Sequence, residues 1–219
     1  MIERDSFMNK KPIVAITMSE AAGIGPEILL KAFSESFIYE VCRPLAIGDL
    51  EILKKSAECC GLDAKFHLVT EPEQGLYQPG TMDLIDLNML KWGDFTIGEP
   101  NAKTGRAMLD YTRTAVQLFL DGRVEGTVGG PHSKYAAELA GEHFDGYPGL
   151  IAQMTGAKHP YLMLSNGKLC VSNVTLHVSL RKALDMLSQE LVYHCIVETE
   201  KAIQAFGISK PRLAVSGLN

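Results

Sequence analysis

The sequence predicts an α/β fold with a largely parallel sheet. Short apolar runs alternate along the chain with longer segments whose apolar residues follow helical spacing. Glycine and proline fall between these segments, where turns and helix ends favour them. Strands that alternate with helices in this way are typical of α/β architecture.

The first strand is expected at Lys11–Thr17, because KPIVAIT is a short apolar run. Met18–Gly25 follows as a loop of small residues. Pro26 then begins a helix, PEILLKAFSES, since proline suits the first helical position and Glu27 suits the first turn. Arg43–Gly48 is the second expected strand.

The middle of the chain continues the alternation. Leu50–Gly61 reads as a helix ended by its glycine, and Ala64–Val69 as a third strand. Residues 71–101 are rich in turn formers and are expected to be irregular. Thr104–Asp121 has helical apolar spacing, and Thr127–Gly130 is a short strand end.

The remaining chain is expected to hold a loop with a helix, two strands, two helices and a final β-like run. These lie at Pro131–Gly141, Tyr161–Ser165, Lys168–Leu176, Ser179–Leu187, Gln189–Phe206 and Arg212–Gly217. The length suits one large or two small domains, and we place them at 1–125 and 126–219. Because no covering helix follows the final run, we expect a fold that is truncated at its C-terminus.

Composition excludes several classes of function. The 219 residues include 21 Lys and Arg against 26 Asp and Glu, a formal net charge of −5. This charge, without a basic run, argues against binding nucleic acid through its phosphates. No apolar stretch reaches the roughly 18–20 residues that cross a bilayer, and MIERDSFMNKKP has no signal-peptide core. We therefore expect a cytoplasmic protein without a nucleic-acid or membrane partner.

A glycine loop, AAGIGPE, lies between the first strand and the first helix. Such a loop allows close backbone approach and exposes N–H groups at a helix N-terminus. It matches neither GxGxxG, because Ile28 stands at the third glycine position, nor a Walker loop. It is therefore either a plain strand-to-helix turn or a ligand loop.

A second candidate segment, GGPHSK, follows the strand end at 127–130. Ligands of α/β proteins gather at the carboxyl edge of the sheet, so His132 and Lys134 could be acid–base or anion-binding groups. They could equally be solvated loop residues. His177, between an expected strand and a helix, could bind a metal through one ring nitrogen or simply bond its loop.

Five stretches in the same order resemble the PdxA family, the 4-hydroxythreonine-4-phosphate dehydrogenases. AAGIGPE is similar to the family's D-P-A-G-I-G-P-E opening. The others are GEPNAKTGRA, GTVGGPHSKYAAELAG, NVTLHVSLRKAL and FGISKPRLAVSGLN. They resemble its middle helix and its T-x-P-x-x-K, T-T-H-x-P-L and F-G-I-x-x-P-R-I-x-V-x-G-L-N segments. The resemblance covers residues 11–219.

The resemblance implies a fold similar to isocitrate and isopropylmalate dehydrogenases, with two α/β domains, and a homodimer. It also implies NAD or NADP and a divalent metal, which could be Zn, Mg or Mn. The implied reaction oxidises a small-molecule carboxylate, a β-hydroxy acid, whose product can lose CO₂. A metal would polarise the hydroxyl group, and a base would take its proton as hydride passes to nicotinamide.

Individual positions follow from the same resemblance. His177 matches the family's first metal-binding histidine, and Lys134 matches the lysine of T-x-P-x-x-K, a catalytic group in substrate contact or proton transfer. Asn219 matches the Asn of N-P-H-A-G-E, whose histidine is the second metal ligand. The third histidine and the main cofactor-binding residues are expected beyond the chain, so no residue here is assigned to the cofactor.

The sequence departs from the family at the substrate. Gly146–Gly149 reads GYPG where phosphate-substrate enzymes have G-H-T-E, and Gly129–Pro131 reads GGP where they have T-A-P. We expect Tyr147, Pro148 and His132 to bind substrate. The G-Y-P variant resembles the terephthalate dihydrodiol dehydrogenase branch, so a dihydrodiol-carboxylate dehydrogenase of aromatic-acid catabolism is an alternative. A catalytically inactive fragment or paralogue is a second alternative.

Overall fold

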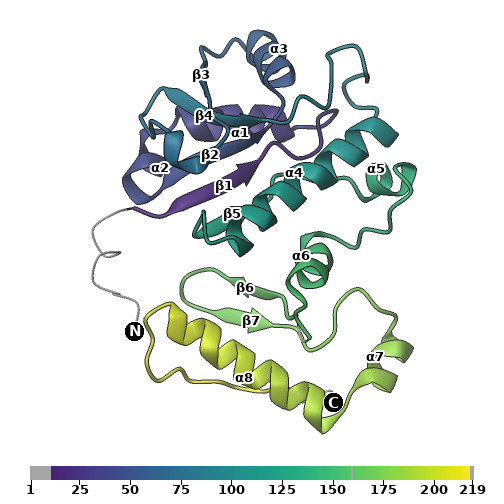
Figure 1. Cartoon of the computed structure of the whole chain (residues 1–219). Coiled ribbons are helices and arrows are strands. Elements are labelled where there is room, and N and C mark those ends of the chain that lie inside the picture. The colour runs from purple at the N-terminus through teal and green to yellow at the C-terminus, as the bar shows by residue number, and fades with distance from the viewer. Residues whose placement is uncertain (1–10, 159, 218–219) are drawn as a thin grey trace. The chain divides into compact units, whose positions relative to one another are not determined.

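The computed structural model describes residues 11–158 and 160–217. The chain divides into two compact units, Met1–Tyr147 and Pro148–Asn219, which we call unit 1 and unit 2 (Figure 1). In the part of the chain that is described, no helix combines the length and apolar character needed to cross a membrane.

Unit 1 is built on a five-stranded parallel sheet. Its strands are β1 (Ile13–Thr17), β2 (Arg43–Gly48), β3 (Lys65–Leu68), β4 (Thr81–Asp86) and β5 (Gly126–Val128). Their order across the sheet is β3-β4-β2-β1-β5. β2 is almost wholly buried, and β1 alternates buried with half-buried residues, as expected of a parallel sheet covered on both faces.

Helices connect these strands and cover the sheet. They are α1 (Gly25–Ser34), α2 (Ser36–Val41), α3 (Leu50–Cys60), α4 (Ala102–Leu120) and α5 (Lys134–Leu139), with a 3₁₀ turn η2 (Pro72–Gln74). Right-handed crossovers place α1 and α3 on one face and α4 on the other (Figure 1). α1 packs against α3, and α4 packs on β1, β2 and β5.

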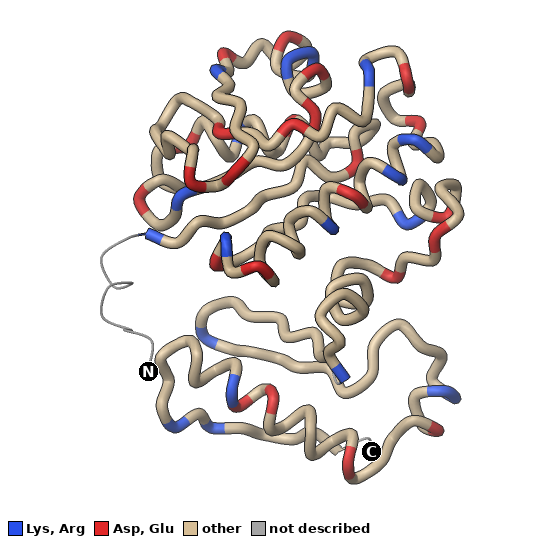
Figure 2. The backbone as a smooth tube through the Cα atoms, viewed as in Figure 1, with Lys and Arg blue, Asp and Glu red and all other residues tan. Residues whose placement is uncertain are grey.

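Local chemistry explains where the helices begin and end. α4 begins after Asn101, whose side chain accepts hydrogen bonds from the backbone N–H groups of Lys103 and Thr104. α3 ends at Gly61, whose φ of +64° lies in the left-handed region that glycine adopts without strain. Figure 2 shows acidic and basic residues interspersed along α4.

The hydrophobic core of unit 1 lies on both faces of the sheet. Its fully buried large side chains include Leu45, Ile47, Ile52, Leu84 and Tyr111. They come from strands β2 and β4 and from helices α3 and α4, so one core joins both helical layers through the sheet. This rigid core fixes the positions of the loops at the strand ends.

Three expectations about secondary structure are wrong. The irregular region expected at 71–101 contains β4, which lies between β3 and β2. The helix expected from Pro26 onward breaks at Glu35, whose extended backbone separates α1 from α2. The β-like run expected at Arg212–Gly217 forms no strand, because it pairs with no described strand.

Unit 2 is a smaller assembly of helices around a hairpin. Its elements are α6 (Tyr147–Thr155), which begins at the last residue of unit 1, then β6 (Met163–Ser165), β7 (Cys170–Ser172), α7 (Leu180–Met186) and α8 (Gln189–Ala205). β6 and β7 pair antiparallel and are shorter than the strands expected there. Among the described residues of unit 2, the buried apolar side chains are Cys195 and Ile203 on α8.

The α/β class and the parallel sheet predicted from the sequence are confirmed. The division at 125/126 and the arrangement resembling isocitrate dehydrogenase stay predictions, as does truncation. β5, which follows residue 125 directly, is joined to unit 1 through its pairing with β1.

Candidate active site at the carboxyl edge of the sheet

Two loops meet at the carboxyl edge of the parallel sheet. β1 ends at Thr17 and β5 at Val128, so the chain that follows each strand emerges on the same side. The Glu20 N–H donates to the Pro131 carbonyl at 3.3 Å, and the Gly130 N–H donates to Thr17 Oγ1 at 3.4 Å. Ligands of α/β proteins bind at this edge.

Ser19 has a strained backbone at this junction. Its φ is +63°, in the left-handed region that non-glycine residues enter rarely, and it is fully buried. Its hydroxyl donates to the Gly130 carbonyl at 3.2 Å. Strain of this kind persists only where the surrounding structure imposes it, and it gathers at functional sites.

Tyr147, the last residue of unit 1, contacts both loops that meet at this edge. Its hydroxyl donates to the Gly130 carbonyl at 2.6 Å and lies 2.5 Å from Ser19 Oγ. Burial raises the pKa of the phenol, although its bond with Ser19 opposes the rise. The hydroxyl of Tyr147, a predicted substrate ligand, is therefore engaged with the protein's own loops.

His132 lies beside this tyrosine. Its ring meets the rings of Tyr147 and Phe144 edge-on, with centroid distances of 4.8 and 5.1 Å. Partial desolvation beside these rings and the nearby charge of Lys134 lower the pKa of His132, although the residue as a whole is exposed. The imidazole is therefore mainly neutral at pH 7 and can accept a proton.

Lys134 is the first residue of α5 and is exposed. Ser133, the residue before it, caps the helix by accepting a hydrogen bond from the Ala136 N–H at 3.1 Å. Because Ser133 holds the helix start, the Lys134 ammonium extends from a fixed backbone position two residues from His132. The structure thus brings together three of the predicted residues: Tyr147, His132 and Lys134.

Glu20 was not singled out by the sequence, yet it is the most unusual polar residue of this edge. It is 4% exposed. In the described part of the chain, its Oε1 is the buried side-chain oxygen without a hydrogen-bond partner. The other oxygen lies 3.3 Å from where a Cβ of Gly23 would stand. A buried carboxylate oxygen without a donor is unfavourable, so this position suits a donor from water or a ligand.

Packing at Gly25 bears on whether the glycine loop is a plain strand-to-helix turn or a ligand loop. A Cβ there would lie 2.3 Å from the Met18 carbonyl oxygen, so close backbone packing requires this glycine. This supports a tight strand-to-helix turn at Gly25. Gly23, at the start of the loop, lies beside the buried Glu20 carboxyl group. The ligand-loop alternative therefore stays open for this part of the loop.

Pro148 and His177 belong to unit 2. Pro148 is exposed on α6. His177 is exposed in the loop between β7 and α7, with a left-handed φ of +52°. Substrate binding by Pro148 and metal binding by His177 stay predictions.

The described residues do not complete a metal site. They contain no group of three or more His, Cys, Asp or Glu side chains placed to hold a metal ion, whereas catalytic metals take about three protein ligands. His177 offers one imidazole. Asn219, expected next to a second ligand, lies outside the described residues. No reaction step is therefore assigned to a metal from this chain.

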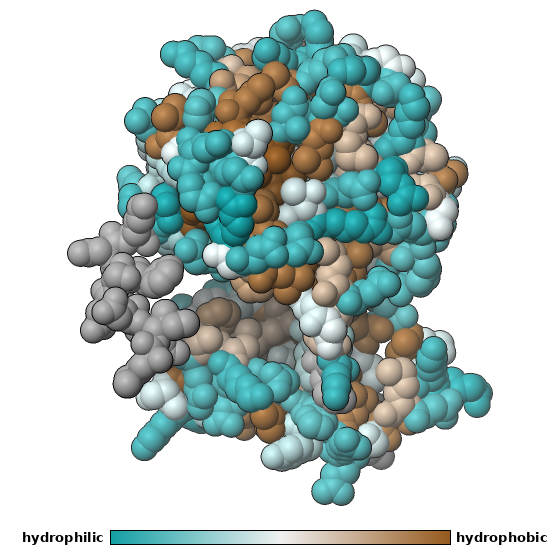
Figure 3. Space-filling view, viewed as in Figure 1, coloured by the Kyte–Doolittle hydropathy of each residue, from teal (hydrophilic) through white to brown (hydrophobic). Residues whose placement is uncertain are grey.

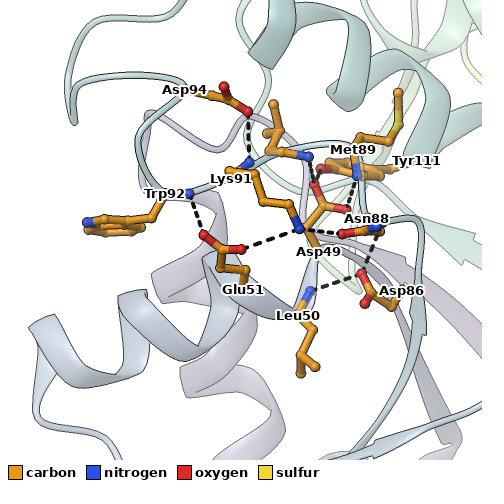
Figure 4. A network of polar contacts seen from close by, with 11 residues as sticks. Asp49, Leu50, Glu51, Asp86, Asn88, Met89, Lys91, Trp92, Asp94 and Tyr111 are labelled. Atoms are coloured by element: carbon orange, nitrogen blue, oxygen red, sulfur yellow. Dashed lines mark hydrogen bonds and ion pairs between the residues drawn. The ribbon is translucent and has the colours of Figure 1, made fainter.

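A second buried carboxylate lies at the same edge, directly after β2 (Figure 4). Asp49 is 1% exposed and accepts hydrogen bonds from Met89 N at 2.9 Å, Leu90 N at 2.7 Å and the Tyr111 hydroxyl at 2.7 Å. Burial raises the pKa of Asp49, and these donors oppose the rise. The network fixes the chain after β4, so its role is structural.

Comparison with known proteins identifies the family. A parallel α/β sheet with polar loops converging at its carboxyl edge places this chain among the α/β proteins, whose ligand sites lie at that edge. The family model "Pyridoxal phosphate biosynthetic protein PdxA" matches residues 40–219. The chain therefore belongs to the PdxA family.

Relatives support this membership. The chain is 36% identical over 212 residues to a 4-hydroxythreonine-4-phosphate dehydrogenase of Desulforapulum autotrophicum, covering 96% of this chain and 62% of that protein. The crystal structure of 4-hydroxythreonine-4-phosphate dehydrogenase from Klebsiella pneumoniae matches with a TM-score of 0.87 and 29% identity, covering 96% of this chain and 64% of that one.

A terephthalate 1,2-cis-dihydrodiol dehydrogenase from Burkholderia xenovorans LB400 also matches, with a TM-score of 0.63 and 30% identity. That match covers 92% of this chain and 60% of that one. The chain thus spans about three fifths of the length of these relatives.

Proposed function

We propose that this chain supplies the sheet and substrate edge of a dehydrogenase that oxidises, and can decarboxylate, a β-hydroxy acid with NAD or NADP. The observation that carries the proposal is the 36% identity, over 96% of the chain, to a 4-hydroxythreonine-4-phosphate dehydrogenase. NAD(P)⁺ would accept the hydride, and the family further implies a divalent metal, Zn, Mg or Mn.

The substrate is proposed to carry a phosphate. The relatives' names specify a phosphorylated hydroxy acid, and this replaces the plain carboxylate expected from the sequence. Lys134 is an exposed cation at the sheet edge, and an ammonium group binds a phosphate or carboxylate as a point charge. Lys134 would hold the anionic end of the substrate.

His132 is the proposed proton acceptor or hydrogen-bonding partner beside Lys134. Its lowered pKa keeps the ring neutral near pH 7, which a base requires. Pro148 and Tyr147 are proposed to shape the same corner, and His177 to supply one metal ligand. The roles of Lys134 and His177 follow the family pattern, whereas Tyr147 and Pro148 stand where the sequence departs from it.

We further propose a cytoplasmic homodimer. Unit 2 leaves large apolar side chains exposed, including Leu164, Leu169, Leu180, Tyr193 and Phe206. Figure 3 shows apolar side chains, in brown, at the surface of unit 2. Extensive exposed apolar surface is typical of a protein–protein interface.

The test is an assay for reduced cofactor. The purified chain, and a version extended through the metal and cofactor residues that the family places further on, are mixed with NAD⁺ or NADP⁺, with Zn²⁺, Mg²⁺ or Mn²⁺, and with 4-hydroxythreonine-4-phosphate or a terephthalate dihydrodiol. The proposal expects turnover of the phosphorylated substrate by the extended version, and a loss of that turnover when it carries Lys134→Ala. Turnover of the diol alone would favour the aromatic-acid alternative, which the Tyr147–Pro148 pair supports. A folded extended version that turns over neither compound would favour the inactive alternative.

A further inference from the structure

Tyr147 fits this site only because residue 129 is glycine. A Cβ at Gly129 would lie 2.4 Å from Cε2 of the Tyr147 ring and 2.6 Å from its Cζ. These separations are far below normal contact distances, and the ring is held in place by its hydroxyl bonds. A side chain at position 129 and a tyrosine at position 147 therefore exclude each other.

Gly130 shows the same tight packing from the other side. A Cβ there would lie 3.0 Å from the Thr17 carbonyl oxygen and 3.1 Å from Ser19 Cβ. The two glycines leave room for the loop after β1 on one side and for the Tyr147 ring on the other. The Gly130 carbonyl then accepts hydrogen bonds from both Ser19 and Tyr147.

We propose that Tyr147 is a positioning residue that latches the loop after β1 to the loop after β5 and fixes His132, and that Gly129 is present to admit it. The two departures from the family pattern, GGP for T-A-P and GYPG for G-H-T-E, are then one coupled change. They are 17 residues apart along the chain but meet in space.

The latch explains two features that otherwise have no cause. The buried Ser19 keeps a left-handed backbone because its hydroxyl is held between the Gly130 carbonyl and the Tyr147 hydroxyl. The His132 ring keeps an edge-on orientation because Tyr147 and Phe144 flank it, and these two rings also contact each other edge-on at 5.8 Å. Fixing both loops preorganises the sheet edge.

A consequence for specificity rests on the proposed function. Since the Tyr147 hydroxyl is engaged with Ser19 and Gly130, it is not free to bind a phosphate. An anion that binds at the carboxyl edge of the sheet would then be bound by Lys134 and the neutral His132 ring. Tyr147 would then act on the substrate only through the residues it holds.

The coupling is tested by a double-mutant cycle on the full chain. Gly129→Ala should lower the ratio of folded to unfolded chain by about tenfold or more, because the added methyl group overpacks against the Tyr147 ring. In a Tyr147→Ala background the same change should have less than about a twofold effect. Gly126→Ala on β5, where a Cβ meets nothing within 4 Å, is the matched control. Equal effects of Gly129→Ala in both backgrounds would refute the coupling.

The positioning of His132 is tested by NMR titration of its ring protons. In the wild type the His132 pKa should lie below that of a free histidine, and Tyr147→Ala should move it upward. Tyr147→Phe keeps the ring and should keep the lowered pKa. An unchanged His132 titration in a folded Tyr147→Ala protein would overturn the positioning role.

The proposed function can fail separately from the latch. Inorganic phosphate is added during the titration, and its binding beside Lys134 should shift the His132 resonance in the wild type and not in Lys134→Ala. A His132 pKa that depends on Tyr147, with no response to phosphate, would support the latch and count against the anion site. Loss of the Tyr147 dependence would count against the latch whatever the phosphate result.

Discussion

Replacing Asp49 by asparagine should destabilise unit 1 without changing the shape of the side chain. One carboxylate oxygen accepts from Met89 N, and the other accepts from Leu90 N and the Tyr111 hydroxyl (Figure 4). An asparagine places an NH₂ group where one oxygen stands. Whichever way the amide turns, a donor then faces at least one buried donor.

The size of the effect follows from these contacts. A buried donor left without an acceptor costs about 1–3 kcal/mol, and removing the buried charge of Asp49 recovers part of this. We therefore expect a loss of about 2 kcal/mol at pH 7. Tyr111→Phe removes one donor along with its bond, and leaves two backbone donors on the carboxylate, so a loss of about 1–2 kcal/mol is expected.

The pH dependence has a definite sign. Burial raises the pKa of Asp49 above its ordinary value of 3.8, so the folded state binds the proton more tightly than the unfolded state. The stability from this group is fully present below the ordinary pKa and is lost as the pH rises through the folded value. The deficit of Asp49→Asn relative to the wild type should therefore be larger at pH 3.5 than at pH 7.

Urea unfolding followed by tryptophan fluorescence measures this directly. Trp92 is the chain's one tryptophan, and its backbone N–H donates to Glu51 Oε1 beside the network. Asp63→Asn, at an exposed position, is the matched control and should stay within about 0.5 kcal/mol of the wild type. An Asp49→Asn midpoint equal to that of the wild type would refute the reasoning.

Three further changes test the sheet edge. Glu20→Met removes a buried oxygen that has no partner, so urea unfolding should show a gain in stability of about 1–2 kcal/mol; a loss of stability would contradict this. Gly25→Ala puts a Cβ 2.3 Å from the Met18 carbonyl oxygen, so the free energy of unfolding should fall by about 2 kcal/mol or more in the same assay. An unchanged unfolding midpoint would contradict this, because it would mean that the loop shifts to accommodate the methyl group. Lys134→Ala should weaken substrate binding about tenfold with an unchanged melting temperature, because its side chain is exposed; equal affinities would remove its role.

The strands that carry continuous apolar runs could be predicted from the sequence. β1 and β2 lie where the short runs indicated, and α3 ends at Gly61 as its glycine implied. β4 could not be found in this way because two acids interrupt its pattern. Asp83 is fully buried and accepts bonds from His67 and from the Leu76 and Tyr77 N–H groups, a role that no local pattern reveals.

Only part of the candidate site could be predicted from the sequence. The strand end before His132 and Lys134 predicted a ligand site at the carboxyl edge of the sheet, and this stays a prediction. The inward orientation of Tyr147 depends on Ser19, 128 residues away in sequence, and no spacing rule connects them. Glu20 stands where the family's D-P-A-G-I-G-P-E opening has its aspartate, but its unpartnered oxygen is a property of packing alone.

The most direct test of the central claim is calorimetric titration of the chain with 4-hydroxythreonine-4-phosphate, in the presence of NAD⁺ and a divalent metal. The account predicts saturable binding by the wild type, and binding about tenfold weaker by Lys134→Ala, whose control is Lys168→Ala at an exposed position of unit 2. Equal binding by all three proteins, or binding by none, would contradict a phosphate-substrate site at the carboxyl edge of the sheet.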